Sequence, residues 1–161
     1  MKNGEILKLP SGLELHPKEF VEPEKVGRRV VILGDTHDPS AITDLAMDAD
    51  ILVHECTNAY IPQELCKVDI SRYQESGATR ESVRQAAISH GHSTPEMAGE
   101  FAKKIRARSL LLNHFSSRYK GSLEPESREV MHAIKSLAQS AFGSDHVTTA
   151  IDFLSVPIPR K

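Results

Sequence analysis

The 161-residue sequence predicts one α/β (or α+β) domain. Two apolar runs, Val30–Leu33 and Ile51–Val53, are short and uninterrupted, which is typical of strands buried on both faces of a sheet. Ile42, Leu45 and Ala46 follow at helical spacing between these runs. The resulting β-α-β order predicts a parallel pair of strands.

A hairpin and a connector precede the first of these strands. Glu5–Leu9 and Leu13–Leu15 flank a Pro-Ser-Gly turn, which predicts a small antiparallel hairpin. Phe20–Arg29 is rich in Pro, Glu, Lys and Arg, and we expect an exposed connector there. The predicted organisation is therefore an edge hairpin and linker over residues 1–28, followed by one partial domain over residues 29–161.

Three helices carry recognisable start signals. Asp38 precedes a proline, and Thr79 and Thr94 each precede a helical apolar pattern, so each is a candidate N-cap. The longest predicted helix opens at Pro125 and ends at Gly143, where a glycine can adopt the left-handed conformation.

The remaining elements are shorter. A third buried strand is predicted over Ser109–Leu112, and a short helix near Gln63–Val68. Val147–Thr149 and Phe153–Ile158 are predicted closing strands, and Pro157 places the last of them at a sheet edge.

Composition limits the possible functions. The net charge is −2 and only 5% of residues are aromatic, with no Trp, so a basic or stacking surface for nucleic acid is not expected. A nucleic-acid partner would have to be held by local patches, by a metal or by another chain. Cys56 and Cys66 match no zinc motif and are too few for a disulfide framework, which favours a reducing compartment.

No apolar run approaches transmembrane length, and Met1–Pro10 lacks the apolar core of a signal peptide. We therefore expect no membrane partner and a cytoplasmic location, with the nucleus or mitochondrion as alternatives.

Asp35 and His114 are candidate metal ligands because each follows a predicted strand. A carboxylate can lie between two metal ions, and a neutral imidazole is a common zinc ligand. The alternatives are a turn aspartate that hydrogen-bonds its own backbone and a strand-end histidine with a structural partner.

His92 lies just before a capped helix, where the helix dipole lowers the pKa of a histidine. A carboxylate partner such as Glu55 would raise that pKa again, and the pair could then donate a proton to a leaving alkoxide. A structural loop histidine is the alternative.

Other polar residues have weaker signals. For Arg118 and Tyr119, holding a phosphate and closing the loop by packing are equally supported. Ser93 has no evident base to activate it as a nucleophile, and no phosphate-binding glycine motif is present. The other histidines are expected to be satisfied loop residues (His37, His54 and His90) or surface residues (His16, His132 and His146).

Four motifs in this order resemble tRNase Z, the zinc-dependent tRNA 3′-processing endonuclease of the metallo-β-lactamase superfamily. They are similar to its GDT loop (Gly34–Thr36), its LxHEAT segment (Leu52–Thr57, with Cys56 in place of Ala), its HST loop (Gly91–Pro95) and its LTHFSxRY signature (Leu112–Tyr119, with Asn113 in place of Thr). The tail Asp152–Lys161 resembles the end of the short-form eukaryotic enzymes.

The resemblance implies a fold and a set of roles. The chain would be the C-terminal half of an αββα sandwich, with one mixed sheet flanked by helices. Asp35 would bridge two zinc ions, and His114 would bind one of them. His92 and Glu55 would form the proton-donating pair. Contacts with precursor tRNA would come from three further residues: Ser93, Thr94 and Arg118. The reaction would be metal-assisted hydrolysis, in which two ions clamp the attacking and leaving oxygens.

The family's HxHxDH motif and one further ligand histidine are absent from these residues. We therefore expect a missing N-terminal half to supply most metal ligands, and this chain alone to be inactive. The sheet face that would pack on that half should be exposed and favour a homodimer or partner. The alternatives are a non-catalytic interaction module and another hydrolase of the metallo-β-lactamase fold that acts on small phosphodiesters.

Overall fold

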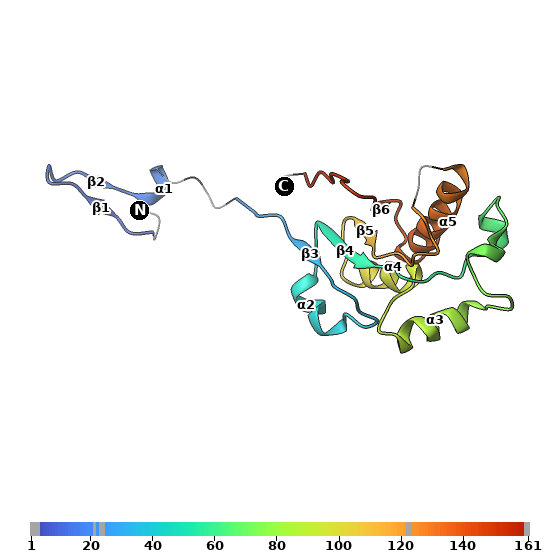
Figure 1. The fold of residues 1–161 in the computed structure, drawn as a ribbon. Coiled ribbons are helices and arrows are strands. Elements are labelled where there is room, and N and C mark those ends of the chain that lie inside the picture. Colours follow the sequence, from blue (N-terminus) through green and yellow to red (C-terminus); the bar gives the residue numbers. More distant parts are fainter. Residues whose placement is uncertain (1–3, 21, 23–24, 122–123, 160–161) are drawn as a thin grey trace.

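The computed structural model describes residues 4–20, 22, 25–121 and 124–159. Its centre is a four-stranded sheet with the order β3-β4-β5-β6, in which every neighbouring pair is parallel (Figure 1). The strands are β3 (Val30–Ile32), β4 (Ile51–Glu55), β5 (Leu110–Asn113) and β6 (Val147–Thr149). The predicted α/β class is confirmed, but among the described residues this sheet is parallel rather than mixed. Each strand reaches the next through a crossover, and a crossover returns the chain in the same direction.

Two helices cover one face of the sheet. α4 (Pro95–Lys104) and α5 (Pro125–Phe142) pack against each other and against the strands (Figure 1). Both helix boundaries predicted from sequence are confirmed: Thr94 accepts a hydrogen bond from Met97 N, and Gly143 ends α5 with φ +75°. The core between helices and sheet includes these fully or largely buried side chains: Leu52, Leu110, Leu112, Val147, Phe101, Ile105, Val130, Ile134 and Leu137.

α4 and α5 approach each other closely at Gly99. A Cβ at this position would lie 2.5 Å from the carbonyl oxygen of Ala138 and 2.9 Å from Ala141 Cβ. Real Cβ atoms do not come so near a backbone oxygen, so only glycine allows the two helices to touch here.

The opposite face of the sheet is exposed along β3, and we call it the uncovered face. Side chains alternate between faces along a strand, so Val30 and Ile32 lie on the side opposite Val31. Val30 is 46% exposed and Ile32 is 71% exposed, whereas Val31 packs against the core. The prediction that Val30–Leu33 is buried on both faces was therefore wrong, because among the described residues no layer packs on the second face of β3.

The connection between β3 and β4 contains a short 3-10 helix, η1 (Ser40–Ile42), and α2 (Thr43–Ala46). Asp38 accepts a hydrogen bond from Ser40 N at 2.9 Å, which places its side chain at this turn as predicted. Hydrogen bonds from Ser40 lower the pKa of Asp38.

Between β4 and α4 the chain forms η2 (Gln63–Leu65), η3 (Ile70–Arg72) and α3 (Arg80–Ser89). η2 accounts for the start of the short helix predicted near Gln63–Val68. Thr79 caps α3 in a capping box with Ser82, as its position before the helix predicts.

The predicted N-terminal hairpin is confirmed. β1 (Leu7–Lys8) and β2 (Glu14–Leu15) pair antiparallel, and α1 (Pro17–Phe20) follows as a single turn that the sequence did not predict. Figure 1 shows this hairpin projecting away from the sheet and its helices. Residues 21 and 23–24 of the predicted connector lie outside the described residues, and the division at residue 28 stays a prediction.

The predicted strand at Phe153–Ile158 is wrong. These residues have no strand pairing, and Phe153 has φ +63° and a fully exposed side chain. Pro157 and Pro159 cannot donate hydrogen bonds to a ladder, which disfavours pairing of this segment with β6.

Candidate metal centre

The candidate site lies at the carboxyl edge of the sheet. The loop after β3 carries Asp35, β4 ends at Glu55, and His114 follows β5 directly. His92 comes from the loop between α3 and α4. Because parallel strands end at one edge, residues that are far apart in sequence meet there.

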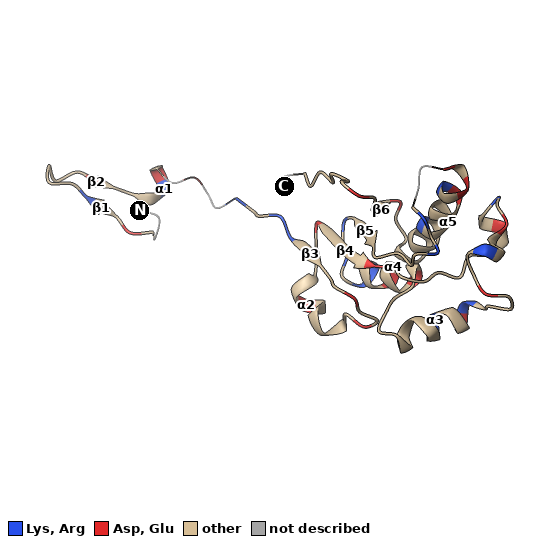
Figure 2. Ribbon diagram, viewed as in Figure 1, with Lys and Arg blue, Asp and Glu red and all other residues tan. Residues whose placement is uncertain are grey.

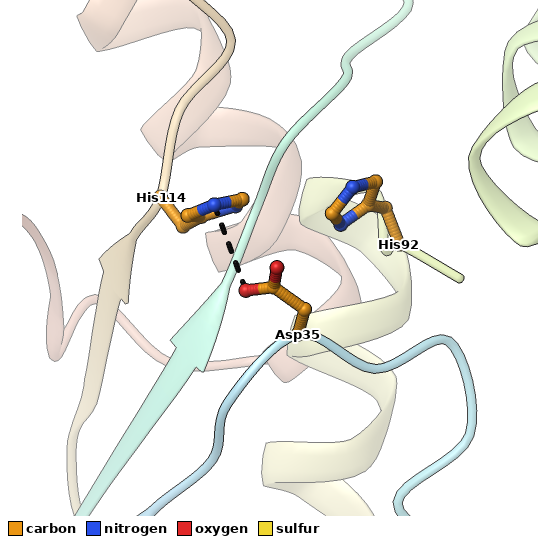
Figure 3. A group of neighbouring side chains, drawn as sticks. All are labelled: Asp35, His92 and His114. Atoms are coloured by element: carbon orange, nitrogen blue, oxygen red, sulfur yellow. Dashed lines mark ion pairs between the residues drawn. The ribbon is translucent and has the colours of Figure 1, made fainter. Parts of the chain in front are cut away.

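Three ligand-type side chains converge at this edge. Asp35, His92 and His114 each offer one ligand atom, and these atoms all lie within 4.8 Å of one another (Figure 3). Asp35 Oδ1 is 3.6 Å from His114 Nε2, and the rings of His92 and His114 have centroids 5.3 Å apart. The two predicted ligands thus face each other. His92 was missing from the predicted ligand set, because a loop histidine beside a helix gave no sign that it would reach Asp35.

Glu55 is a buried carboxylate that joins three loops. It accepts hydrogen bonds from Ser93 N at 2.6 Å and from Thr36 N at 3.4 Å. Its other oxygen accepts from Thr57 N at 3.0 Å and from the Thr57 hydroxyl at 2.8 Å. A carboxylate with donors on both oxygens holds the loops of Asp35 and His92 in a fixed relation.

His92 faces Glu55, as predicted for a proton-donating pair. Its Nδ1 lies 3.4 Å from Glu55 Oε1, and this buried nitrogen has no hydrogen-bond partner among the described residues. The contact becomes an ion pair when His92 is protonated. The pairing is seen, whereas the proton-donating role stays a prediction.

His114 adopts an unusual backbone conformation. Its φ is +53°, in the left-handed region that residues other than glycine rarely enter. Such conformations cluster at functional sites, where the surrounding structure enforces them. The side chains of His114 and Asp35 are 50% and 55% exposed, so the cluster is accessible to a substrate from solvent.

Ser93 and Thr94, two predicted substrate contacts, are buried. The Ser93 hydroxyl donates to Thr36 O at 2.6 Å, and the Thr94 hydroxyl caps α4. Both side chains therefore have structural roles that the sequence did not reveal, and their contact with substrate stays a prediction.

Arg118 is exposed and lines a cavity of about 240 Å³ together with Asn58 and Tyr119. Its Nε donates to Ser116 Oγ at 3.3 Å. For Tyr119, the packing alternative holds: its hydroxyl accepts from Ala59 N at 3.0 Å and donates to Ala59 O at 3.1 Å. Burial raises the pKa of Tyr119.

Two of the flanking histidines have a partner at Nδ1, but the buried Nε2 of His54 has none among the described residues, so His54 is only partly satisfied. His54 is fully buried, and its Nδ1 lies 2.8 Å from Glu55 O. Burial lowers the pKa of His54 because it disfavours the charged ring. His90 Nδ1 lies 2.7 Å from Ala86 O at the end of α3.

Charge is mixed on the surface around the site. Figure 2 shows Lys and Arg interleaved with Asp and Glu along α3, α4 and α5. This agrees with the net charge of −2 and indicates that any anionic partner is attracted locally. Within the described residues, no helix is both long and apolar enough to cross a lipid bilayer.

The donor types of the cluster fit zinc. One carboxylate and two imidazoles are among the ligands that zinc prefers, and a catalytic zinc ion usually has three protein ligands. The three donor atoms lie within 4.8 Å of one another, so Asp35 and His114 could bind one ion while His92 lies close enough to act on a group bound there. A second ion would need ligands beyond this cluster.

Comparison with curated proteins finds relatives along the whole chain. Zinc phosphodiesterase ELAC protein 1 of Bos taurus is 34% identical over 169 residues, which is 100% of this chain and 40% of that protein. Ribonuclease Z of Bacillus subtilis (strain 168) is 36% identical over 162 residues, which is 99% of this chain and 42% of that protein. The resemblance to the tRNase Z family is thus confirmed for these residues. The chain spans about 40% of the length of these relatives, and the two kinds of relative match it about equally well.

Solved structures give weaker similarities. Human tRNase Z, short form (ELAC1), has a TM-score of 0.48 at 29% identity, over 91% of this chain and 37% of that chain. The metallo-beta-lactamase fold protein YhfI from Bacillus subtilis has a TM-score of 0.47 at 21% identity, over 75% of this chain and 36% of that chain. No protein-family model matches the chain.

Proposed function

We propose that this chain, related over its whole length to ribonuclease Z and ELAC1 zinc phosphodiesterases, supplies part of the centre of a zinc endoribonuclease that removes the 3′ trailer from precursor tRNA. The observation that carries the proposal is the convergence of Asp35, His92 and His114 at one sheet edge. Four loops separated in sequence bring these side chains and Glu55 together, which a chance cluster of surface residues would not do.

Asp35 and His114 would be the zinc ligands that this chain supplies. Zinc at this position would polarise the phosphodiester and stabilise the charge that develops on its oxygens. His92 would deliver a proton to the leaving oxygen. With Nδ1 facing Glu55, the proton to be transferred is the one on Nε2.

Arg118 is our candidate for binding a substrate phosphate. Its guanidinium is exposed at a cavity beside Asn58, which follows the Glu55–Thr57 segment. A planar guanidinium can bind a phosphate through two parallel hydrogen bonds. Ser93 and Thr94, which are buried, would act on the substrate only through the loop that carries His92, which they hold in place.

The remaining metal ligands would come from a polypeptide that carries HxHxDH. Glu55 and Val53 lie on the same side of β4 as the exposed Ile32 across the sheet. A partner that covers the uncovered sheet face would therefore also border the metal centre. The same apolar face is where we expect a homodimer to form.

Both cysteines are free thiols, which is consistent with a reducing compartment. Cys56 and Cys66 are buried and free, and burial raises the pKa of the Cys56 thiol well above its usual value. We place the protein in the cytoplasm, with the nucleus or mitochondrion as alternatives.

The test is complementation. This chain, an HxHxDH-bearing polypeptide and zinc are mixed, and cleavage of a precursor tRNA is followed by gel electrophoresis. We expect cleavage only with all three components, and none by this chain alone. Asp35→Asn and His114→Ala should each reduce the rate by at least about 100-fold, whereas His132→Ala on the exposed side of α5 should not change it. Cleavage that is insensitive to both site variants would reject the proposal.

A second candidate is a non-catalytic interaction module. The uncovered apolar face of the sheet, with Val30 and Ile32 at its edge, favours this alternative. Zinc binding separates the two candidates: a module would bind no zinc, whereas the catalytic proposal requires zinc that is lost with His114→Ala. Cleavage of small phosphodiesters but not precursor tRNA would instead indicate a different hydrolase of the metallo-β-lactamase fold.

A further inference from the structure

Thr57 lies between two residues of the candidate site. Its hydroxyl oxygen is 2.8 Å from Glu55 Oε2 and 2.9 Å from His114 Nδ1. It is also 3.1 Å from the carbonyl oxygen of His114. One threonine side chain thus connects the buried carboxylate after β4 to the exposed imidazole after β5.

The two shortest contacts fix where the protons lie. A carboxylate only accepts hydrogen bonds, so the single hydroxyl proton of Thr57 is donated to Glu55. That bond is charge-assisted and shorter than the contact with the His114 carbonyl, so it takes precedence. The Thr57 oxygen can then only accept, and the contact at 2.9 Å requires a proton on His114 Nδ1.

The opposite proton arrangement is unfavourable. If Thr57 donated to His114 Nδ1, a lone pair of its oxygen would face Glu55 Oε2 across 2.8 Å. Two acceptor oxygens at that distance repel each other, and because Glu55 itself is buried, water screens this repulsion little. Glu55 therefore sets the tautomer of His114 through Thr57.

With the proton on Nδ1, the neutral His114 ring has its free lone pair on Nε2. That atom lies 3.6 Å from Asp35 Oδ1. Two electron-rich atoms then face each other without a proton between them, which is an arrangement that a cation stabilises. Metal-binding histidines commonly have the other ring nitrogen bonded to a carboxylate, carbonyl or water, which orients the ring.

We propose that Thr57 is a positioning residue that selects the Nδ1–H tautomer of His114 and directs its Nε2 toward a metal ion. The part of this inference that concerns metal rests on the proposed function. The backbone N–H of Thr57 binds Glu55 independently at 3.0 Å, so the hydroxyl is not required to hold that carboxylate. Its distinct contribution is the link to His114.

The first test reads the tautomer without metal. The chain is labelled with ¹⁵N-histidine and freed of metal with a chelator. Its imidazole nitrogens are observed by NMR about two pH units above the usual histidine pKa of about 6.5. His114→Gln assigns the signals. We expect the Nδ1–H tautomer at His114 in the wild type and in Thr57→Ser, and a mixture of tautomers or a switch to Nε2–H in Thr57→Val.

Two controls separate this effect from a loss of folding. Thr57→Val keeps the shape of the side chain and the backbone hydrogen bond to Glu55. Thr148→Val removes a hydroxyl from an exposed position on β6 and should leave His114 unchanged. An Nε2–H tautomer in the wild type, or the same His114 spectrum in Thr57→Val as in the wild type, would overturn the inference.

The second test measures zinc affinity by competition with a chromophoric chelator. We expect Thr57→Val to weaken zinc binding about 10- to 100-fold, as is typical for loss of such a partner, and Thr57→Ser to restore it. Equal zinc affinity in Thr57→Val and the wild type would refute the role in metal binding. The proposed function can fail separately. If the His114 tautomer and the zinc affinities are as expected but the complemented protein does not cleave precursor tRNA, the proposed substrate is wrong and the role of Thr57 still holds.

Discussion

The two faces of the sheet are built from the same strands but have different surroundings. On one face, Leu52, Leu110 and Leu112 are almost completely buried beneath α4 and α5. On the other, Ile32 is 71% exposed although it is as apolar as its buried neighbours. Residue type therefore sets only the tendency of a side chain to be buried. Whether it is buried depends on whether another element packs against it.

The site belongs to the uncovered side. Side chains alternate along β4, so Glu55 lies on the same side as Val53 and opposite His54. Loops that carry Thr36, Thr57 and Ser93 cover Glu55, whereas Val30 and Ile32 on β3 stay exposed in the part of the chain that the structure describes. The covered face thus contributes most of the core, and the candidate site lies on the other side of the sheet, beside an apolar surface.

The largest expected effect tests the covered face. Leu112→Ala should lower the free energy of unfolding by about 2–5 kcal/mol, because the substitution leaves a cavity among buried side chains. Urea denaturation followed by circular dichroism measures it. Leu45→Ala, at a position 79% exposed, is the matched control and should cost far less. Equal losses in the two variants would mean that the core is not where the structure places it.

The packing between the covering helices is tested at Gly99. Gly99→Ala should destabilise the protein by about 1–3 kcal/mol, because its Cβ would meet the Ala138 carbonyl oxygen at 2.5 Å and force the helices apart. Gly27→Ala is the control, since a Cβ there meets no atom within 4 Å. A stable Gly99→Ala variant would indicate that α4 and α5 are less closely packed in solution.

The burial of His54 on the covered face should make the stability of the protein depend on pH. Burial lowers its pKa in the folded state, whereas the unfolded chain takes up the proton near the ordinary value of about 6.5. Stability should therefore fall as the pH drops below about 6.5, with a slope of at most about 1.4 kcal/mol per pH unit from this group.

Urea titrations of the wild type and His54→Leu between pH 8 and pH 5 measure this contribution. The wild type should lose more stability than the variant over that range, and the exposed His132→Leu control should behave like the wild type. Parallel profiles for the wild type and His54→Leu would show that the ring is not desolvated.

The smallest effect is expected on the uncovered face. Ile32→Ala should change the free energy of unfolding by less than about 0.5 kcal/mol, because this side chain is already largely in water. The same urea titration measures it. A loss as large as that of Leu112→Ala would mean that a second copy or another partner covers this face in solution, and analytical ultracentrifugation of the two proteins would then show the difference in mass.

Much of the fold could be predicted because its signals are local. Thr79, Thr94 and Gly143 mark helix ends through the hydrogen bonds and backbone conformations that their own residue types favour. The strands β3, β4 and β5 followed from short apolar runs, and β6 was predicted as a closing strand at Val147–Thr149. Phe153–Ile158 has a similar apolar content but no neighbour to pair with, and pairing is not encoded within the segment.

The sequence by itself indicated Asp35 and His114 as candidate metal ligands and the loops on which they lie, because ligand chemistry belongs to the residue type. It also determined the resemblance to the tRNase Z family, which depends on the order of motifs. Only the tertiary structure decided that His92 joins Asp35 and His114, that Thr57 links His114 to Glu55, and that one sheet face stays uncovered. Those facts depend on distances between residues 20 to 80 positions apart, and such distances are set by the pairing of parallel strands rather than by local preference.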